Sequence, residues 1–279
     1  MNRQQRAQMG QETLSILESG MYRAPDGSLV SIESALAASI AGAVLYRPAD
    51  YGALLNQVKA RPAAGERVIT VSSGTTLKAG QALVGQYENV VCLNFASAKN
   101  PRGGFLSGSQ AQEESLARAS GLYATQQAQF AFYDYHRSGH SCLYSDHVIY
   151  SPSVPVFRDD AGTLLVQPWQ CHFQTAAAVN AGAVRQNEPQ RVEEIVPVME
   201  QRTRMVLATA IAHGCQALVL GAWGCGVFKN DPVVVAGIFA KVLAEAPFAG
   251  QFLHIDFAVY DPSGTGATLA AFQKQFAST

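Results

Sequence analysis

NVVCLNFA, residues 89–96, is a largely apolar run that leads into a glycine turn at residues 102–108. Its valines and its continuous hydrophobicity are typical of a strand that is buried on both faces of a sheet. A helical pattern follows over residues 112–132. The order of strand, glycine turn and helix predicts one unit of an α/β sheet.

The same order recurs near the C-terminus. ALVLG, residues 217–221, runs into AWGCGVFKND, residues 222–231, and a helix is predicted over residues 232–245 with proline near its first position. Further strands are predicted over 68–72, 148–150, 164–166 and 253–260, helices over 3–20, 31–45, 77–83 and 193–213, and a loop packed near a site over 175–184. This alternation predicts a sheet with helices on both faces, and ligands bind such sheets at the carboxyl ends of the strands.

Composition narrows the class of protein. The chain has 279 residues, 48% of them hydrophobic, and a formal net charge of −1. A near-neutral charge argues against nucleic-acid binding by the whole surface. No apolar run approaches the roughly 20 residues that span a bilayer, and the N-terminus lacks the pattern of a signal peptide. We therefore expect a cytoplasmic protein that binds neither a membrane nor nucleic acid directly.

The cysteines and histidines predict neither a metal site nor a disulfide framework. The five cysteines are odd in number and widely spaced, at positions 92, 142, 171, 215 and 225. A second group combines histidine with cysteine, but its spacing fits no zinc pattern; it comprises His136, His140, Cys142 and His147. We expect free thiols in a reducing compartment, His172 and His254 as packed residues of strands, and no metal or other cofactor.

The two glycine segments together favour a diphosphate site. Glycine lets a backbone come close to a phosphate, and two such loops that each leave a buried strand can hold a diphosphate between them. Neither segment matches Gly-x-Gly-x-x-Gly or a Walker loop, which disfavours a Rossmann dinucleotide site and ATP hydrolysis. Ordinary turn geometry is the alternative for each loop. Phe228 in the second loop either packs on a ribose or base or fills the core.

Two adjacent carboxylates, Glu113 and Glu114, open the helix that follows the first loop. Carboxylates can perform acid–base chemistry on a glycosidic bond. Adjacent helical residues point about 100° apart, so the two cannot face one bond from opposite sides as in an ordinary glycosidase. At most one is then the direct acid, and the other binds or tunes the substrate. The alternative is a pair of solvated glutamates at a helix start.

These motifs together resemble those of the bacterial-type poly(ADP-ribose) glycohydrolases, which are macrodomain proteins. The signature of that family is a triple glycine, a spacer of about six to eight residues and Gln-Glu-Glu. Here it corresponds to Arg102-Gly103-Gly104, a seven-residue spacer and Gln112-Glu113-Glu114. Residues 94–98 are similar to the strand end before that loop, and residues 221–228 to the second diphosphate loop.

The resemblance implies a fold. We expect a macrodomain-like mixed α/β sheet flanked by helices on both faces, forming one compact catalytic domain over residues 66–279. Residues 1–65 resemble the helical accessory segment that is typical of the bacterial form.

The resemblance also implies an activity, the hydrolysis of ribose–ribose O-glycosidic bonds in poly(ADP-ribose) with release of ADP-ribose. Glu114 would be the general acid and then the base, and Glu113 would hold ribose hydroxyls. The other implied substrate-binding positions are Asn94, Gly103, Gly104, Phe105, Gln112, Gly224, Cys225, Gly226, Val227 and Phe228. The implied partners are the polymer or ADP-ribosylated proteins in the response to DNA damage, and the implied protein is a monomer without cofactor.

One position departs from the family pattern. Arg102 stands where the first glycine is expected, and arginine is costly there if the position needs a positive φ. We expect activity to be retained because Gly103 and Gly104 remain. A non-catalytic ADP-ribose reader and a mono-ADP-ribosyl hydrolase of the same fold are the alternative functions.

Overall fold

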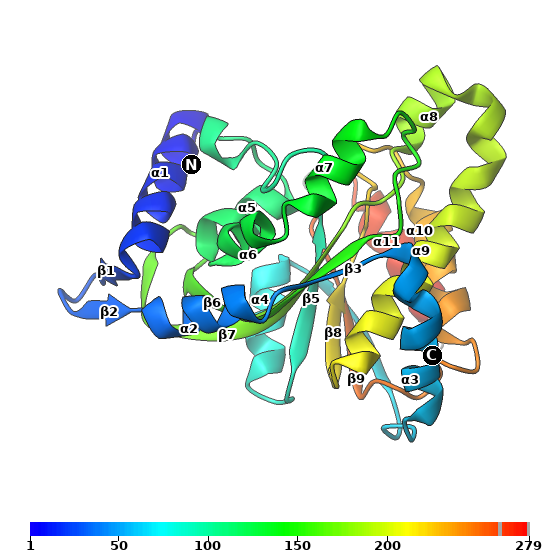
Figure 1. Ribbon diagram of the computed structural model, residues 1–279, viewed down its shortest axis with the longest axis horizontal. Helices are drawn as coiled ribbons and strands as arrows, with labels where there is room; N and C mark the ends of the chain where they lie inside the picture. Colours follow the sequence, from blue (N-terminus) through cyan, green and yellow to red (C-terminus); the bar gives the residue numbers. More distant parts are fainter. Residues whose placement is uncertain (262–263, 278–279) are drawn as a thin grey trace.

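The computed structural model describes residues 1–261 and 264–277. Its central sheet has the strand order β3-β6-β7-β5-β8-β9-β4 (Figure 1). The first three strands in that order pair antiparallel, and β7, β5, β8, β9 and β4 run parallel. In sheet order the strands are β3 (Val44–Tyr46), β6 (Val148–Arg158), β7 (Leu164–Ala176), β5 (Val90–Phe95), β8 (Ala217–Leu220), β9 (His254–Val259) and β4 (Val68–Ser73).

Helices cover both faces of the sheet. One face packs against α3 (Tyr51–Ala60), α9 (Ile195–Ala212), α10 (Pro232–Leu243) and α11 (Ala267–Phe276). The other packs against α4 (Thr76–Val84), α5 (Gln112–Ala119) and α6 (Leu122–Ala128). The predicted mixed sheet with helices on both faces is confirmed.

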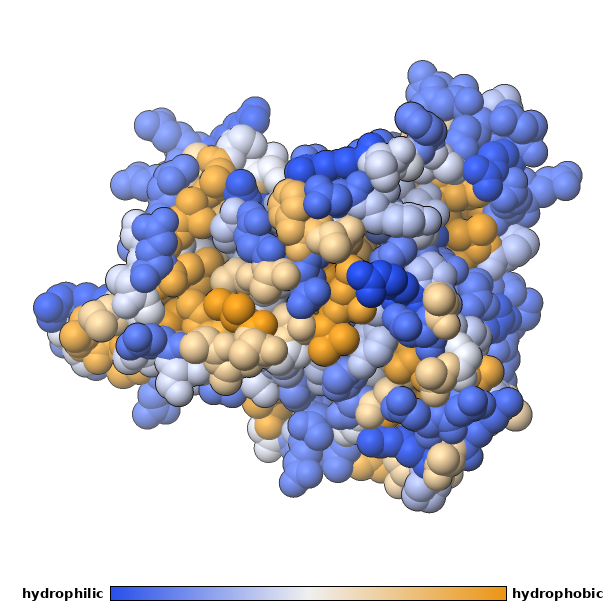
Figure 2. Space-filling view, viewed as in Figure 1, coloured by the Kyte–Doolittle hydropathy of each residue, from blue (hydrophilic) through white to orange (hydrophobic). Residues whose placement is uncertain are grey.

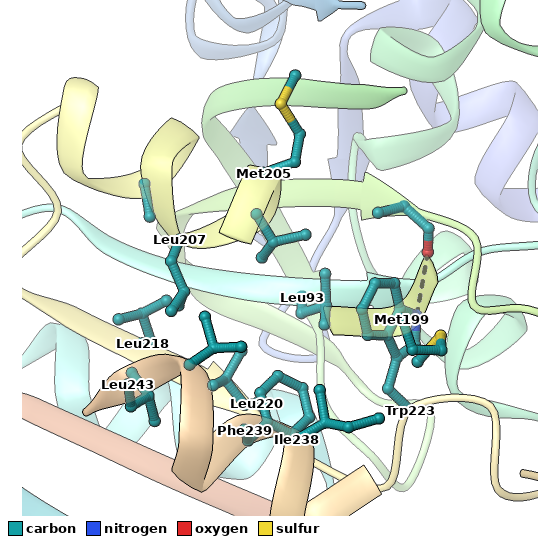
Figure 3. Packing of buried hydrophobic residues seen from close by; sticks show 14 of the residues in the cluster. Leu93, Met199, Met205, Leu207, Leu218, Leu220, Trp223, Ile238, Phe239 and Leu243 are labelled. Carbon is teal, nitrogen blue, oxygen red and sulfur yellow. Dashed lines mark hydrogen bonds between the residues drawn. The ribbon is translucent and has the colours of Figure 1, made fainter. Parts of the chain in front are cut away.

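Successive side chains along the central strands point to opposite faces of the sheet, which explains why both faces carry a core. In β5, Val91 and Leu93 belong to the cluster under α9 and α10, whereas Val90 and Cys92 belong to the cluster under α4 and α5. Figure 3 shows Leu93 within the first cluster, among Met199, Leu220 and other apolar side chains. The run NVVCLNFA is apolar throughout because both of its faces are buried.

The predicted helix over residues 112–132 is wrong as a single helix. Ser120 is extended, with φ −149°, and forms an isolated bridge with Val156 of β6. The amide of Gly121 also donates to Pro155 O at 2.9 Å. This contact with the sheet divides the segment into three helices, α5, α6 and α7 (Ala131–Ser138). Their apolar side chains therefore do not follow one helix axis.

Other predicted boundaries also move. The helix predicted over 31–45 ends as α2 (Glu33–Ala41), since the following residues pair with β6 as β3. The short strands predicted at 148–150 and 164–166 are the first residues of the long β6 and β7, and the loop predicted over 175–184 begins inside β7. The remaining elements are α1 (Arg3–Ser19), β1 (Met21–Arg23), β2 (Leu29–Ser31), η1 (Pro48–Asp50), η2 (Phe105–Ser107), α8 (Ala181–Asn187) and η3 (Pro189–Glu194).

The segment before residue 66, predicted as a helical accessory segment, also contains strands and takes part in the central sheet. It contains the β1–β2 hairpin, it supplies edge strand β3 to the sheet, and its helix α3 packs in the same core as α9. The domain boundary between residues 65 and 66 stays a prediction. None of the helices in residues 1–261 and 264–277 combines the length and the hydropathy of a membrane span.

Candidate active site

Both glycine loops leave the carboxyl ends of parallel strands, the first from β5 and the second from β8. The chain at and just after the end of β7, which pairs with β5 on the side away from β8, holds the second loop. Trp223 Nε1 donates to Ala176 O at 3.2 Å, a bond drawn in Figure 3, and Asn230 Nδ2 donates to Val179 O at 2.7 Å. The expected grouping of both loops at one edge of the sheet is thus observed.

Glu113 is buried and held by three donors. Its side chain is 3% exposed. Oε1 accepts from Asn94 Nδ2 at 3.2 Å and from Gln126 Nε2 at 3.0 Å, and Oε2 accepts from the Ser97 amide at 2.8 Å. Burial raises the pKa of the Glu113 carboxyl to about 8, and the three hydrogen bonds offset this only in part. At neutral pH the carboxyl is therefore mostly protonated.

Glu114 lies against the glycine turn with one oxygen free of bonds. Its Oε1 accepts from the Gly104 amide at 3.0 Å, and no hydrogen bond within the described residues uses Oε2. Gly103 has φ +54°, and a Cβ there would collide with Glu114 Oε1 and lie 3.3 Å from Glu113 Oε2. The missing side chain of Gly103 thus leaves space where both carboxylates meet the loop.

The side chains of Gln112 and Asn94 hold the start of α5 and the Glu113 carboxyl in place through hydrogen bonds. Gln112 Nε2 donates to Leu93 O at 2.7 Å and to Thr76 Oγ1 at 3.0 Å, while its Oε1 accepts from the Phe95 amide at 2.8 Å. The Gln112 side chain therefore clamps the start of α5 to the end of β5. Asn94 is fully buried and binds Glu113. Their expected contacts with substrate stay a prediction, and in the structure their side chains bond to Glu113 and to the end of β5.

Arg102 adopts the glycine-like backbone with a side chain that packs inward. Its φ is +65°. The guanidinium carbon lies 4.5 Å from the ring centre of Tyr123 and 5.0 Å from that of Phe105. The suspected strain is therefore present, and the charge packs on aromatic rings instead of facing the glycine turn. Phe105 itself is fully buried, so its expected contact with substrate remains a prediction for its backbone alone.

The second loop offers backbone donors. Gly224 has φ +74°, and a Cβ there would lie 2.5 Å from Asn230 Nδ2 and 2.6 Å from Ala178 Cβ. No hydrogen bond between described residues uses the amides of Gly226, Val227 or Phe228. Free amides in a glycine-rich turn are suited to an anion.

The side chains of the second loop differ in their surroundings. Val227 is 80% exposed, and Phe228 is half-buried with its ring 5.9 Å from that of Tyr144. Phe228, within the loop, is partly buried against the core cluster, whereas Trp223 is fully buried; the expected packing of Phe228 on a ribose or base stays a prediction. Burial raises the pKa of the Cys225 thiol to about 12, which keeps it neutral and unsuited to nucleophilic chemistry.

His136 and His147 form a buried network, whereas His140 is exposed. His136 Nε2 and His147 Nδ1 both bond to Ser145 Oγ at 2.7 Å, and His136 Nδ1 bonds to Phe132 O. Burial lowers the pKa of His136 to about 4. Across the part of the chain that the structure describes, no group of histidine, cysteine and carboxylate side chains is placed to hold a metal ion.

Sequence reasoning missed three residues around Glu113. Ser97 supplies the amide to Oε2, and Gln126 supplies a donor to Oε1. Burial, and to a lesser degree the ionised form of the nearby Glu113, raises the pKa of the Tyr133 hydroxyl. Ser97 could have been found because it follows the strand end. Gln126 and Tyr133 come to the site only because the helix breaks at Ser120, which no local signal predicted.

The sheet, the two loops and the adjacent carboxylates define a macrodomain-type glycosidase site. Residues 10–159 match the family "Microbial-type PARG, catalytic domain". Poly(ADP-ribose) glycohydrolase (PARG) from Thermomonospora curvata is 48% identical, with a TM-score of 0.94, 98% of this chain covered and 100% of that one. No curated protein matches the chain.

Two further structures extend the likeness to ligand complexes. The T. curvata enzyme bound to the inhibitor ADP-HPD has a TM-score of 0.91 at 48% identity, with 98% of this chain and 100% of that chain covered. PARG from Deinococcus radiodurans in complex with ADP-ribose has a TM-score of 0.83 at 45% identity, with 87% and 97% covered. The chain belongs to the microbial-type poly(ADP-ribose) glycohydrolase family and is a glycosidase that hydrolyses poly(ADP-ribose).

Proposed function

We propose that Glu114 carries the acid–base chemistry of poly(ADP-ribose) hydrolysis and that Glu113 positions the substrate. The observation that carries this division is the difference in hydrogen bonding. Both oxygens of Glu113 are occupied by Asn94, Gln126 and Ser97, whereas Glu114 bonds only through Oε1. An acid must bring one free oxygen to the leaving group, and Glu114 Oε2 meets that need.

The proposed reaction uses one carboxyl twice. Glu114 donates its proton to the ribose oxygen of the leaving group as the bond from that oxygen to the anomeric carbon breaks. The anomeric carbon then carries oxocarbenium character. Glu114, now a carboxylate, takes a proton from a water molecule whose oxygen bonds to that carbon. The second transfer restores the protonated acid, so one residue suffices and no opposed carboxylate is needed.

Glu113 is proposed to hold ribose hydroxyls in its neutral form. A neutral carboxyl can donate one hydrogen bond and still accept others. The buried amide oxygens of Asn94 and Gln126 have no partner within the described residues. If either side-chain amide turned over, its oxygen would accept a hydrogen bond from the protonated Glu113 carboxyl in the free enzyme. Neutral Glu113 also removes the repulsion that two adjacent carboxylates would otherwise exert.

The glycine loops are proposed to hold the diphosphate of the terminal unit, through the backbone of Gly103 and Gly104 and of residues 224–228. Phe228 would then pack on the terminal ribose. Binding of the diphosphate at the Gly104 amide would take from Glu114 Oε1 its hydrogen bond to the loop.

The physiological setting stays an inference from the family. We infer a cytoplasmic monomer that removes polymer from ADP-ribosylated proteins during the response to DNA damage, without a cofactor and without direct contact with nucleic acid. The near-neutral charge of the chain supports the last point.

A change of leaving group tests the role of Glu114. A ribose alkoxide needs a proton to depart, whereas a nitrophenolate does not, so the Glu114→Gln variant should lose far more activity on polymer than on an ADP-ribose nitrophenyl glycoside. We expect about 10³-fold loss on polymer and at least tenfold less loss on the aryl substrate. Equal losses on the two substrates would show that Glu114 is not the acid.

A further inference from the structure

Lys99 and Arg137 lie side by side at the rim of the carboxylate site. Lys99 belongs to the turn that joins Ser97, which binds Glu113, to Gly103, which flanks Glu114. Arg137 lies in the last turn of α7, and its Nε donates to Lys99 O at 2.7 Å. Both side chains are exposed, and Figure 2 shows strongly hydrophilic atoms gathered over α7.

The positions of these two cations are constrained. The Asn100 amide bonds to Ser97 Oγ at 3.3 Å, and the Gly103 amide bonds to Asn100 O at 3.0 Å, which folds the turn that carries Lys99. The guanidinium carbon of Arg137 lies 5.0 Å from the ring centre of Phe130. The Arg137 side chain and the backbone of Lys99 are therefore held in place, which lowers the entropy lost on binding an anion.

Their charges are not neutralised. Neither Lys99 nor Arg137 forms an ion pair with a carboxylate in residues 1–261 and 264–277, although Asp134 lies on the same helix as Arg137. Among the lysines and arginines of the described residues, ion pairs are formed by Arg158, Arg191, Arg202, Arg204 and Lys241. Two unpaired positive charges beside the acid–base site favour an anionic part of the substrate.

The chemistry of the polymer supplies that anion. The bond that is cleaved joins the terminal ADP-ribose to a ribose hydroxyl of the next unit, and the next unit carries a diphosphate of its own. The terminal diphosphate is already assigned to the two glycine loops. We propose that Lys99 and Arg137 bind the diphosphate of the next ADP-ribose unit, on the leaving-group side of Glu114; this inference rests on the proposed roles of Glu114 and the loops.

Two substrates that differ only in the second diphosphate test the subsite. One is the dimer of ADP-ribose. The other is ADP-ribose joined by the same ribose–ribose bond to adenosine, which keeps the scissile bond and lacks the second diphosphate. The Lys99→Gln/Arg137→Gln variant should lose about fivefold to tenfold in kcat/KM on the dimer, as expected for two exposed charge contacts, and less than twofold on the adenosine conjugate.

Three controls keep the outcome interpretable. The loss on the dimer should shrink at 1 M salt, where charges are screened within about 3 Å. The exchange Lys99→Arg/Arg137→Lys should restore most of the activity. The Arg23→Gln/Lys59→Gln variant removes the same charge from exposed positions outside the loops and should behave like the wild type on both substrates.

The result that overturns the subsite is an equal effect of Lys99→Gln/Arg137→Gln on the two substrates, whether that effect is large or absent. If the wild-type enzyme cleaved neither substrate, that result would instead count against the proposed reaction. A loss on the dimer alone that persists unchanged in 1 M salt would also contradict binding through charge.

Discussion

In the loop after β5, a carboxylate oxygen lies against the glycines, and arginines of a distant helix hold the turn. Glu114 accepts from Gly104, while Arg3 and Arg6 of α1 donate to Ser107 O and Gly108 O at 2.9 Å. In the loop after β8, the amides of residues 226–228 point to no partner within the described chain, and the carboxylate of Asp231 caps α10.

The contrast shows that one local order of strand, glycine turn and helix supports two roles. In the proposed reaction the first loop positions a reactive group, and its glycines leave room for carboxylates. The second loop presents backbone donors, so its glycine at 224 leaves room for the Asn230 side chain that shapes the turn. A change in the first loop should therefore lower turnover, and a change in the second should weaken binding.

Among changes to the two loops, the largest effect is expected from Gly103→Ala. Its new Cβ would displace Glu114 Oε1, and φ of +54° is itself unfavourable for alanine. Displacement of a catalytic group by about 1 Å costs on the order of 10²-fold, so kcat on polymer should fall by at least that factor. Steady-state assays of ADP-ribose release provide the measurement.

A matched change in the second loop sharpens the comparison. Gly224→Ala places a Cβ 2.5 Å from Asn230 Nδ2 and should raise KM more than it lowers kcat. Gly237→Ala on α10, where a Cβ meets nothing within 4 Å, should change neither constant. The division of roles between the loops is wrong if Gly103→Ala raises KM alone.

The next effect concerns stability and pH. The folded protein keeps Glu113 protonated up to a pKa of about 8, whereas the unfolded chain ionises near 4.5. Folding then takes up a proton, so the free energy of unfolding should fall as pH rises from about 5 to 8. Glu113→Gln should remove this slope and raise the free energy of unfolding at pH 8 by about 1–3 kcal/mol relative to the wild type.

Urea titrations at several pH values would measure that slope. Glu66→Gln, at an exposed position, serves as the matched control and should leave the slope unchanged. A slope that survives in Glu113→Gln would show that another group takes up the proton.

The smallest effect is expected from Arg102→Gly. Glycine relieves a φ of +65°, worth about 1 kcal/mol, and loses the stacking on Phe105 and Tyr123, worth a similar amount. Stability and activity should stay close to wild type, while Arg102→Ala should destabilise by about 1 kcal/mol because it keeps the strain and loses the stacking. Chemical denaturation of the two variants distinguishes these contributions, and equal stability of both would contradict them.

The sequence predicted the elements that depend on local patterns. Apolar runs such as 89–96 and 217–221 fall in β5 and β8, and the glycines with positive φ mark their loops. The break at Ser120 and the edge strand β3 were missed because both arise from pairing with distant β6. For the same reason Gln126 and Tyr133 could not be placed near Glu113, and Gln112 could not be recognised as a clamp.

The central claim is that Glu114 performs the chemistry and Glu113 positions the substrate. The most direct measurement compares Glu114→Gln with Glu113→Gln in two assays, turnover of polymer and the Kd for ADP-ribose by calorimetry. We predict that Glu114→Gln loses about 10³-fold in turnover with a Kd near that of the wild type, whereas Glu113→Gln weakens binding and keeps more of the turnover. Near-normal turnover in Glu114→Gln, or a larger loss in Glu113→Gln, would contradict the claim.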